Sequence, residues 1–193
     1  MPYPSHCHNK RHIPHEIIAI PHQDKQVIEI ILMKPELLHD IEAVIKQIEQ
    51  LRDASVPAGS PKPAPLLSTD AADNYLIQRY IDTAVNQAVK RCSAYLLLPS
   101  PFVHRISTNH IYGWEEKSIF LAMPMQWTPH SVDALRDSIH NYIVEHTLHL
   151  FLQRPDPKAA EVSAFQAEQC WNDINACLSA RMAPIDIQPT FLG

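Results

Sequence analysis

The chain has 193 residues, 46% of them hydrophobic and 19% charged, which is enough apolar content for one domain or two small ones. It has only three glycines, whereas the usual frequency would give about thirteen. Gly59, Gly113 and Gly193 lie far apart in the sequence. Phosphate-binding loops, dinucleotide fingerprints and nucleophile elbows need clustered glycines, because only glycine lets the backbone approach an anion so closely. The composition therefore argues against those enzyme classes.

The charge balance is acidic, with 16 Lys and Arg against 21 Asp and Glu and a formal net charge of −5. Basic residues cluster only at Lys10-Arg11 and Lys90-Arg91. Because nucleic-acid binders usually present a basic face, direct DNA or RNA binding is disfavoured. No apolar run reaches membrane length, and residues 1–11 lack the apolar region of a signal peptide. We therefore expect a cytoplasmic protein with no membrane partner.

The cysteine pattern indicates reduced thiols. The four cysteines, Cys7, Cys92, Cys170 and Cys177, include no CxxC pair. Cys170 and Cys177 lie a heptad apart in a stretch with helical periodicity, about 10 Å along the axis, which is too far for a disulfide within one straight helix. We expect core-type cysteines rather than a disulfide framework.

The first third of the chain predicts an extended arm followed by a small β-hairpin and a helix. Residues 1–15 carry three prolines and four histidines without periodicity, which indicates an extended arm. Two β-rich runs, 16–20 and 26–33, flank a polar turn and predict a hairpin. Apolar residues at helical spacing then predict an amphipathic helix over 36–53. Together, residues 16–54 form the predicted hairpin–helix unit.

A proline-rich linker separates this unit from a mainly helical part. Residues 55–68 contain four prolines and no period, so we place the domain boundary there and expect a semi-rigid segment. A long helical segment then runs from the cap cluster Ser68-Thr69-Asp70 to Leu98, where Pro99 stops it.

The remainder of the helical part, 69–183, predicts an inserted β-hairpin and a helix pair. The β-rich runs 102–107 and 117–123 form the hairpin. Helices follow over about 131–154 and 158–182, and the short Pro155-Asp156-Pro157 break predicts that they pair antiparallel.

The apolar pattern of this helix pair predicts how its first helix is buried. Leu148, Phe151 and Leu152 spread apolar character around the end of that helix, which predicts burial on more than one side. Residues 184–193 form an extended tail.

These elements predict an α+β fold that is mainly α. It has a helical core with an inserted β-hairpin, a preceding hairpin–helix unit and extended termini.

Two groups of residues could hold a metal. The segment with His6, Cys7, His8 and His12 could supply four zinc ligands, although a structural zinc site usually draws ligands from two elements. His146 and His149 share a helical face next to Glu145, but the HExxH order is absent. For both groups we favour the simpler interpretation, that no metal is bound and that His146 belongs to the core.

The tryptophans could mark either packing or a binding surface. Trp171 lies on a helical core stripe and favours packing. Trp114 and Trp127 flank the second hairpin and could face a partner. Glu115 and Glu116 are adjacent, so their side chains diverge and do not form a catalytic carboxylate pair.

The stretch from about Asp70 to Arg181 resembles the head–tail connector, or head-completion, proteins of tailed bacteriophages. The resemblance lies in a helix ending in AVKRCSAYLL, a short β-excursion, the helix DALRDSIHNYIVEHTLHLFLQR, a proline break and a helix opening with AAEVSAFQAEQCWNDI. It implies a non-enzymatic virion neck protein without cofactor, a homo-oligomeric ring that bridges the portal protein and tail or neck proteins. DNA could pass through such a ring without sequence-specific binding.

The resemblance also suggests how the chain would hold its partners, because connector proteins grip their neighbours with extended ends. The arm 1–15 and the tail would suit this role, and the tail residues that would dock on a partner are Ile185, Ile187, Phe191 and Leu192. The alternative function is a metal-binding or regulatory intracellular helical binding protein that uses the N-terminal His/Cys group.

Overall fold

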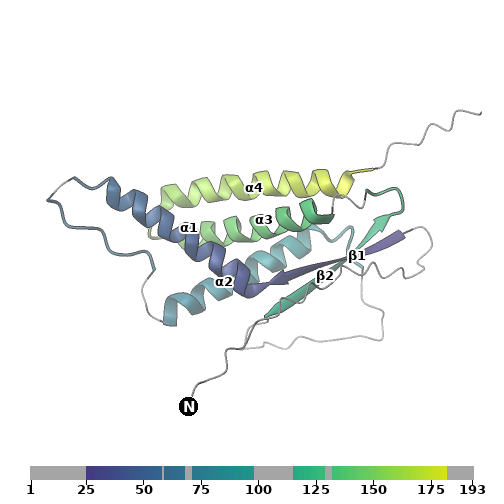
Figure 1. Ribbon diagram of the computed structural model, residues 1–193, viewed down its shortest axis with the longest axis horizontal. Coiled ribbons are helices and arrows are strands. Elements are labelled where there is room, and N and C mark those ends of the chain that lie inside the picture. The colour runs from purple at the N-terminus through teal and green to yellow at the C-terminus, as the bar shows by residue number, and fades with distance from the viewer. Residues whose placement is uncertain (1–24, 58, 68–70, 98–114, 129–131, 182–193) are drawn as a thin grey trace, which may run out of the picture.

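A computed structural model describes residues 25–57, 59–67, 71–97, 115–128 and 132–181 (Figure 1). The described elements are β1 (Lys25–Met33), α1 (Lys34–Ala54), α2 (Ala71–Arg91), β2 (Glu116–Pro124), α3 (Val132–Leu152) and α4 (Pro157–Ser179). The fold is mainly helical with a small two-stranded antiparallel sheet, which confirms the predicted class.

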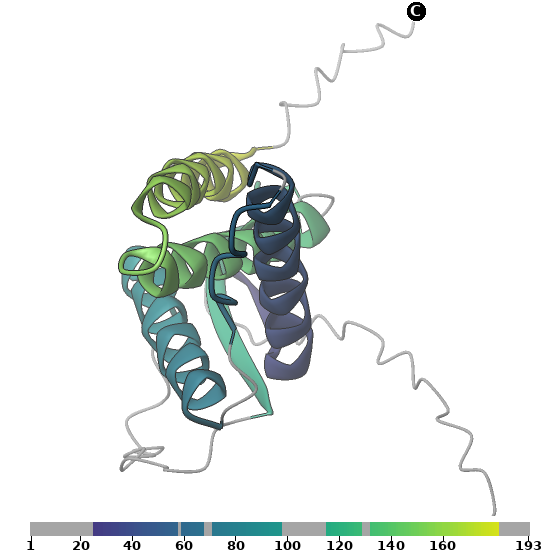
Figure 2. The ribbon, with the colours of Figure 1, turned by 90° about the vertical axis from the view of Figure 1, so that its left-hand side faces the viewer.

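Helix α3 lies at the centre of the molecule. Figure 2 shows α4 above it, α2 and the sheet below it, and α1 running beside it; contacts join α3 to α1, α2, α4 and β1. Its side chains are buried from Leu135 near its beginning to Leu152 at its end. Leu148, Phe151 and Leu152 are all buried, so the predicted burial of this helix on more than one side is confirmed.

The two strands pair with each other, although the sequence analysis placed them in separate hairpins. They run antiparallel in register from Lys25 opposite Pro124 to Met33 opposite Glu116. Residues directly opposite share a face, and the pair Ile30 and Ile119 belongs to the face buried in the core. The other arms of the predicted hairpins, 16–20 and 102–107, lie outside the described residues.

The second edge of β2 is also hydrogen-bonded, because α2 ends earlier than predicted. The helix stops at Arg91 instead of Leu98, and the chain turns through Cys92, whose carbonyl accepts from the Tyr95 N–H at 2.9 Å. The Tyr95 carbonyl then accepts from the Ala122 N–H at 2.7 Å, and the Leu97 N–H donates to the Phe120 carbonyl at 3.0 Å. The requirement to pair this edge of β2 therefore overrides the helical pattern of the preceding residues.

The proline-rich segment between α1 and α2 packs against α1. The Glu49 carboxylate accepts from the backbone N–H groups of Leu66 and Leu67, and the Arg52 guanidinium donates to the Ala64 carbonyl. Leu66 is buried and belongs to a hydrophobic cluster that also contains residues of β1, α1, α2, α3 and α4. The residues on either side of the predicted boundary thus share one core.

An ion pair at the junction of β1 and α1 holds these elements to α2. Lys34 is only 5% exposed, and its Nζ lies 3.2 Å from Asp82 Oδ1 in α2. Lys117 of β2 lies close by, and burial lowers the pKa of its amine, with the positive charge of Lys34 acting in the same direction and Asp82 opposing it. A buried ammonium needs a compensating carboxylate, so Asp82 fixes where α2 meets the sheet.

We predict that Asp82→Asn will lower the free energy of unfolding by about 1–3 kcal/mol, because it removes the negative charge that lies 3.2 Å from the buried Lys34 ammonium. Asp82 is itself 43% exposed, which keeps the effect below that of a fully buried pair. Urea denaturation measures it. The matched control is Lys62→Gln, which removes the exposed pair with Asp53 and should cost less than about 0.5 kcal/mol. Equal losses in the two variants would contradict the role assigned to Asp82.

Candidate functional site

A cluster of aromatic and charged side chains lies where α2, α3 and α4 meet. Arg91, the last residue of α2, donates to both carboxylate oxygens of Glu168 in α4, at 2.7 and 3.3 Å. Its guanidinium lies 5.3 Å from the ring centroid of Tyr142 in α3 and 5.1 Å from that of Trp171 in α4. His146 stacks on Tyr142, with centroids 5.5 Å apart. We call these five residues the Arg91 cluster.

The titratable members of the Arg91 cluster affect one another's pKa values. The hydrogen bond between Arg91 and Glu168 raises the pKa of the guanidinium and lowers that of the carboxyl. Burial raises the pKa of Tyr142, which the positive charge of Arg91 partly opposes. Burial lowers the pKa of His146, with smaller lowering contributions from His149 and Arg91. The cluster therefore favours a neutral imidazole beside a charged guanidinium, an arrangement that joins three helices by cation–π and ionic contacts.

His146 and His149 do not form a metal site in this arrangement. Both ring nitrogens of His149 have hydrogen-bond partners, with Nδ1 3.0 Å from the Ala160 carbonyl and Nε2 3.0 Å from the Gln153 amide nitrogen. Because a carbonyl only accepts and an amide nitrogen only donates, these partners assign the proton to Nδ1. Across the described part of the chain, no group of three or more His, Cys, Asp or Glu is arranged to hold a metal ion.

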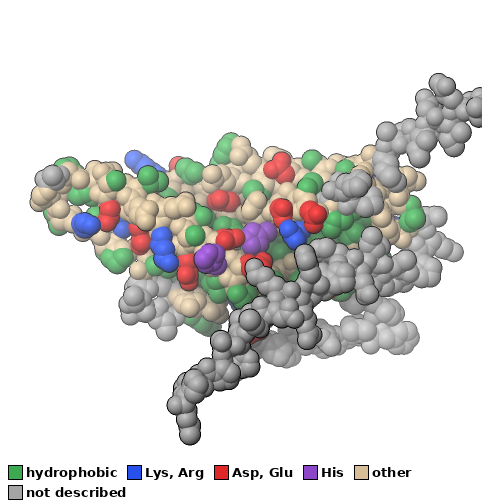
Figure 3. Space-filling view, in the orientation of Figure 1, with side chains coloured by type: hydrophobic (Ala, Val, Ile, Leu, Met, Phe, Trp, Pro, Cys, Tyr) green, Lys and Arg blue, Asp and Glu red, His purple; other side chains and the backbone are tan. Residues whose placement is uncertain are grey.

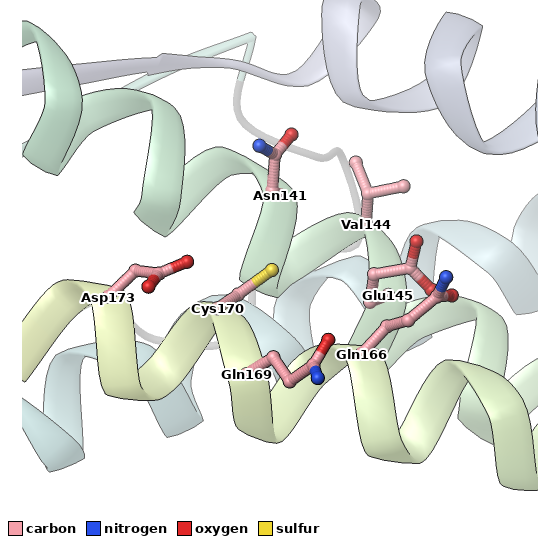
Figure 4. Close-up of a pocket in the computed structure, with 7 residues that line it drawn as sticks. All are labelled: Asn141, Val144, Glu145, Gln166, Gln169, Cys170 and Asp173. Atoms are coloured by element: carbon pink, nitrogen blue, oxygen red, sulfur yellow. The ribbon is translucent and has the colours of Figure 1, made fainter.

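A polar groove lies between α3 and α4, on the flank of α4 opposite to the Arg91 cluster (Figure 4). It has a volume of about 250 Å³ and is open to solvent. We call it the α3–α4 groove. Its lining combines amides, carboxylates, a thiol and one apolar side chain: Asn141, Val144, Glu145, Gln166, Gln169, Cys170 and Asp173. The groove therefore presents hydrogen-bonding groups of both kinds and two acidic groups.

Glu145 contributes a partly buried carboxyl to the α3–α4 groove. Its Oε2 atom is buried and has no hydrogen-bond partner among the described residues. Burial raises the pKa of this carboxyl, and a hydrogen bond with Ser163 acts in the opposite direction. A buried acceptor without a partner is unfavourable, so this position favours a donor, and a cationic donor most of all.

The surface around these features carries charges of both signs. Figure 3 shows acidic, basic and histidine side chains interspersed over one face of the molecule, with hydrophobic side chains among them. A second hollow on the surface, between α1 and α3, is lined by Pro35, Glu36, His39, Asp40 and His140. There the His140 Nε2 lies 2.8 Å from Asp40 Oδ2, which ties α1 to α3.

The structure corrects one expectation about the tryptophans. Trp127 does not face a partner: its side chain is 0% exposed, and its indole Nε1 donates to the Cys177 carbonyl at 2.7 Å. The indole closes the end of the core because the chain after β2 turns back towards α4. Trp171 is partly buried and packs against the core, as its place on a helical stripe predicted. Trp114 lies outside the described residues.

Most of the predicted binding residues lie outside the described residues. These are the metal candidates His6, Cys7, His8 and His12 and the tail residues Ile185, Ile187, Phe191 and Leu192. They stay predictions. Sequence reasoning missed the Arg91 cluster and the α3–α4 groove. The available signal was the polar spacing Gln166, Gln169, Cys170 and Asp173, which places four side chains along one flank of α4.

Comparison of the chain with protein-family models, curated proteins and solved structures finds no match. None of the helices in the described ranges combines the length and the apolar character needed to cross a membrane.

We predict that the Arg91 cluster makes stability depend on pH through His146. The pKa of His146 is lower in the folded state than in the unfolded chain, where it is near 6.5. The free energy of unfolding is therefore not reduced by this group above about pH 6.5. The free energy of unfolding decreases as the pH falls from about 6.5 through the pKa of His146 in the folded state, because the unfolded chain binds the proton more readily. His146→Phe keeps a ring stacked on Tyr142 and should reduce the loss between pH 7 and pH 5 by up to about 1 kcal/mol.

Thermal unfolding at pH 7 and pH 5 measures this difference. The matched control is His39→Gln, because His39 is exposed and has no place in the Arg91 cluster. Between pH 7 and pH 5, the His39→Gln control should lose as much stability as the unmodified chain. If His146→Phe shows the same pH dependence as the control, His146 is not the group responsible.

Proposed function

We propose that the chain is a structural subunit of a tailed-phage virion, a head–tail connector that forms a homo-oligomeric ring and joins the portal to tail or neck proteins. In this proposal the subunit acts by binding complementary protein surfaces and catalyses no reaction. The proposal rests on the resemblance over about residues 70–181 and on one surface feature of α4.

The order of the described elements supports the proposal. The resemblance requires a helix, a β-excursion, a helix, a proline break and a helix, and the chain has α2, β2, α3, the Pro155 and Pro157 break, and α4 in that order. Asp156 caps α4, because its carboxylate accepts from the Ala159 N–H at 3.1 Å. The α3–α4 pair is thus a well-defined helical hairpin that could present a rigid surface.

The observation that carries the proposal is the outer face of α4. This helix packs on α3 through small and apolar residues such as Ala160, Ala167 and Ile174. On its outer side, Val162 and Phe165 are 57% and 65% exposed. They are three residues apart and therefore share a helical face. Burying each in a subunit contact would gain about 1–2 kcal/mol, so this face suits an interface.

A ring also needs a second, different surface on each subunit, because a closed ring is built from head-to-tail contacts. Phe120 of β2 and Met125 just after it are exposed apolar residues. They belong to the sheet side of the molecule, which lies across α3 from α4 (Figure 2). In the proposed ring, the outer face of α4 contacts the sheet side of the next copy.

We predict that Phe165→Asp will disrupt assembly while leaving the fold intact, because it places a charge in the proposed contact. Native mass spectrometry and light scattering, with and without cognate portal rings, measure assembly, and circular dichroism monitors the fold. Leu51→Asp is the matched control, since Leu51 is 73% exposed at the end of α1 and should tolerate the change. An unmodified chain that stays monomeric and ignores portal rings would refute the proposal.

Removing the tail tests the proposed docking of Ile185, Ile187, Phe191 and Leu192. Deletion of residues 184–193 should leave the helical content and the melting temperature nearly unchanged, because the described core ends before this segment. It should abolish binding to the partner ring, as measured by co-sedimentation. A loss of the fold would instead assign the tail to the core, and unchanged binding would remove it from the interface.

A further inference from the structure

The sheet has an open edge among the described residues, and this edge belongs to β1. Strand β2 is bonded on both sides, because one edge pairs with β1 and the other exchanges hydrogen bonds with Tyr95 and Leu97. Within the part of the chain that the structure describes, β1 pairs with β2 alone. An edge strand presents a row of N–H and C=O groups to which another strand can bind.

The hydrogen bonds of the sheet show which residues of β1 present their backbone groups to the open edge. The Lys34 N–H donates to the Glu115 carbonyl at 2.9 Å, and this hydrogen-bonded pair continues the register of β1 with β2. Such pairs alternate along an antiparallel ladder, so the even-numbered residues of β1 bond to β2. The backbone groups of Val27, Glu29 and Ile31 therefore point away from β2, and no hydrogen bond joins them to another described residue.

Strand β1 is regular enough to accept a further strand. Its nine residues pair with β2 in one register without a bulge, and the sequence KQVIEIILM contains no proline or glycine. Native sheets commonly protect an open edge with a proline, a bulge or charged side chains. In β1 the charged residues are Lys25 and Glu29, so their placement decides which strand the edge accepts.

The charges of β1 favour a second copy of β1 as that strand. Lys25 and Glu29 lie on one face of the strand, two residues on either side of Val27. When two copies pair antiparallel about Val27, each Lys25 lies directly opposite the Glu29 of the other copy, which stabilises the pair. The register that overlaps all nine residues instead places Glu29 opposite Glu29, which is unfavourable. The strand is thus complementary to itself in the register centred on Val27.

We propose that two copies of the chain pair through the open edge of β1, antiparallel and with Val27 on the two-fold axis. The backbone groups of Val27 bond to their equivalents and those of Lys25 bond to Glu29, so the two sheets become one. This contact is isologous and uses the backbone of β1, whereas the ring contact is head-to-tail and uses the side chains of Phe120 and Met125. It also leaves α4 free, because α4 lies across α3 from the sheet (Figure 2). The pairing therefore goes beyond the connector function and does not depend on it.

Charge reversal on the full chain tests the register. The experiment uses the Phe165→Asp background, in which the proposed ring contact is removed, and this chain should sediment as a dimer. Lys25→Glu should weaken the dimer about tenfold, because two Glu–Glu contacts replace two ion pairs, and adding Glu29→Lys should restore it. Lys46→Glu is the matched control, because Lys46 is exposed on α1 and the change in net charge is the same. Analytical ultracentrifugation measures the dissociation constant, and circular dichroism monitors the fold.

A new thiol on the two-fold axis tests the geometry. In the proposed pair, the two Val27 Cα atoms lie about 5.5 Å apart, which is within the range of a disulfide. Val27→Cys should therefore give a disulfide-linked dimer on mild oxidation with copper phenanthroline, identified among the natural cysteines by peptide mass spectrometry. Ile31→Cys is the matched control, because the Cα atoms at that position lie about 27 Å apart across the axis.

Three results would overturn the pairing. The first is a chain that sediments as a monomer, and the second is a dimer that Lys25→Glu does not weaken. The third is a disulfide in Ile31→Cys and none in Val27→Cys, which contradicts the register. Hydrogen exchange identifies the alternative occupant: protected amides at Val27 and Glu29 in a monomer would assign the edge to a segment of the same chain.

These experiments separate the pairing from the connector function. Failure of the unmodified chain to assemble with portal rings, with the β1 dimer retained in the Phe165→Asp chain, would refute only the connector. Ring assembly by a chain that gives no β1 dimer would refute only the pairing.

Discussion

The burial of α3 along its whole length is the constraint on which the other elements depend. Its apolar residues are distributed around the helix, from Leu135 and Ile139 to Leu148 and Leu152, so no single neighbour could cover them. Contacts with β1, α1, α2 and α4 together provide the cover. Because one helix has to be enclosed by elements from both ends of the chain, the two halves of the sequence form one core instead of two.

The sequence predicted the helices well and the sheet poorly, for a physical reason. Helical periodicity is a local property, so the ends of α1, α3 and α4 lie within three residues of the predicted ones. Alternation along a strand indicates which face is buried but not which strand is its neighbour. The pairing of β1 with β2 joins segments about ninety residues apart, and no nearby turn signal could indicate it.

The candidate site was predicted only in part, because it depends on how helices approach one another. The shared face of His146 and His149 was predicted from their spacing. The structure adds the hydrogen-bond partners of the His149 ring and the stacking of His146 on Tyr142. Arg91 could not be associated with Tyr142 or Trp171 from spacing, since the three residues come from three helices. Trp127 was misjudged because its position beside a predicted hairpin said nothing of the return of α4 to the same end.

The two flanks of α4 differ in how completely their polar groups are satisfied. On one flank, Arg91 of α2 pairs with Glu168 of α4 and lies against the rings of Tyr142 and Trp171. On the other flank, Glu145 lies against α4 with an unpartnered carboxylate oxygen among the described residues. The first set of contacts is complete, whereas the second leaves one carboxylate oxygen of Glu145 unpartnered among the described residues. Val144 belongs both to the lining of the groove and to the hydrophobic core, so the unpartnered oxygen of Glu145 lies where the core meets the polar surface.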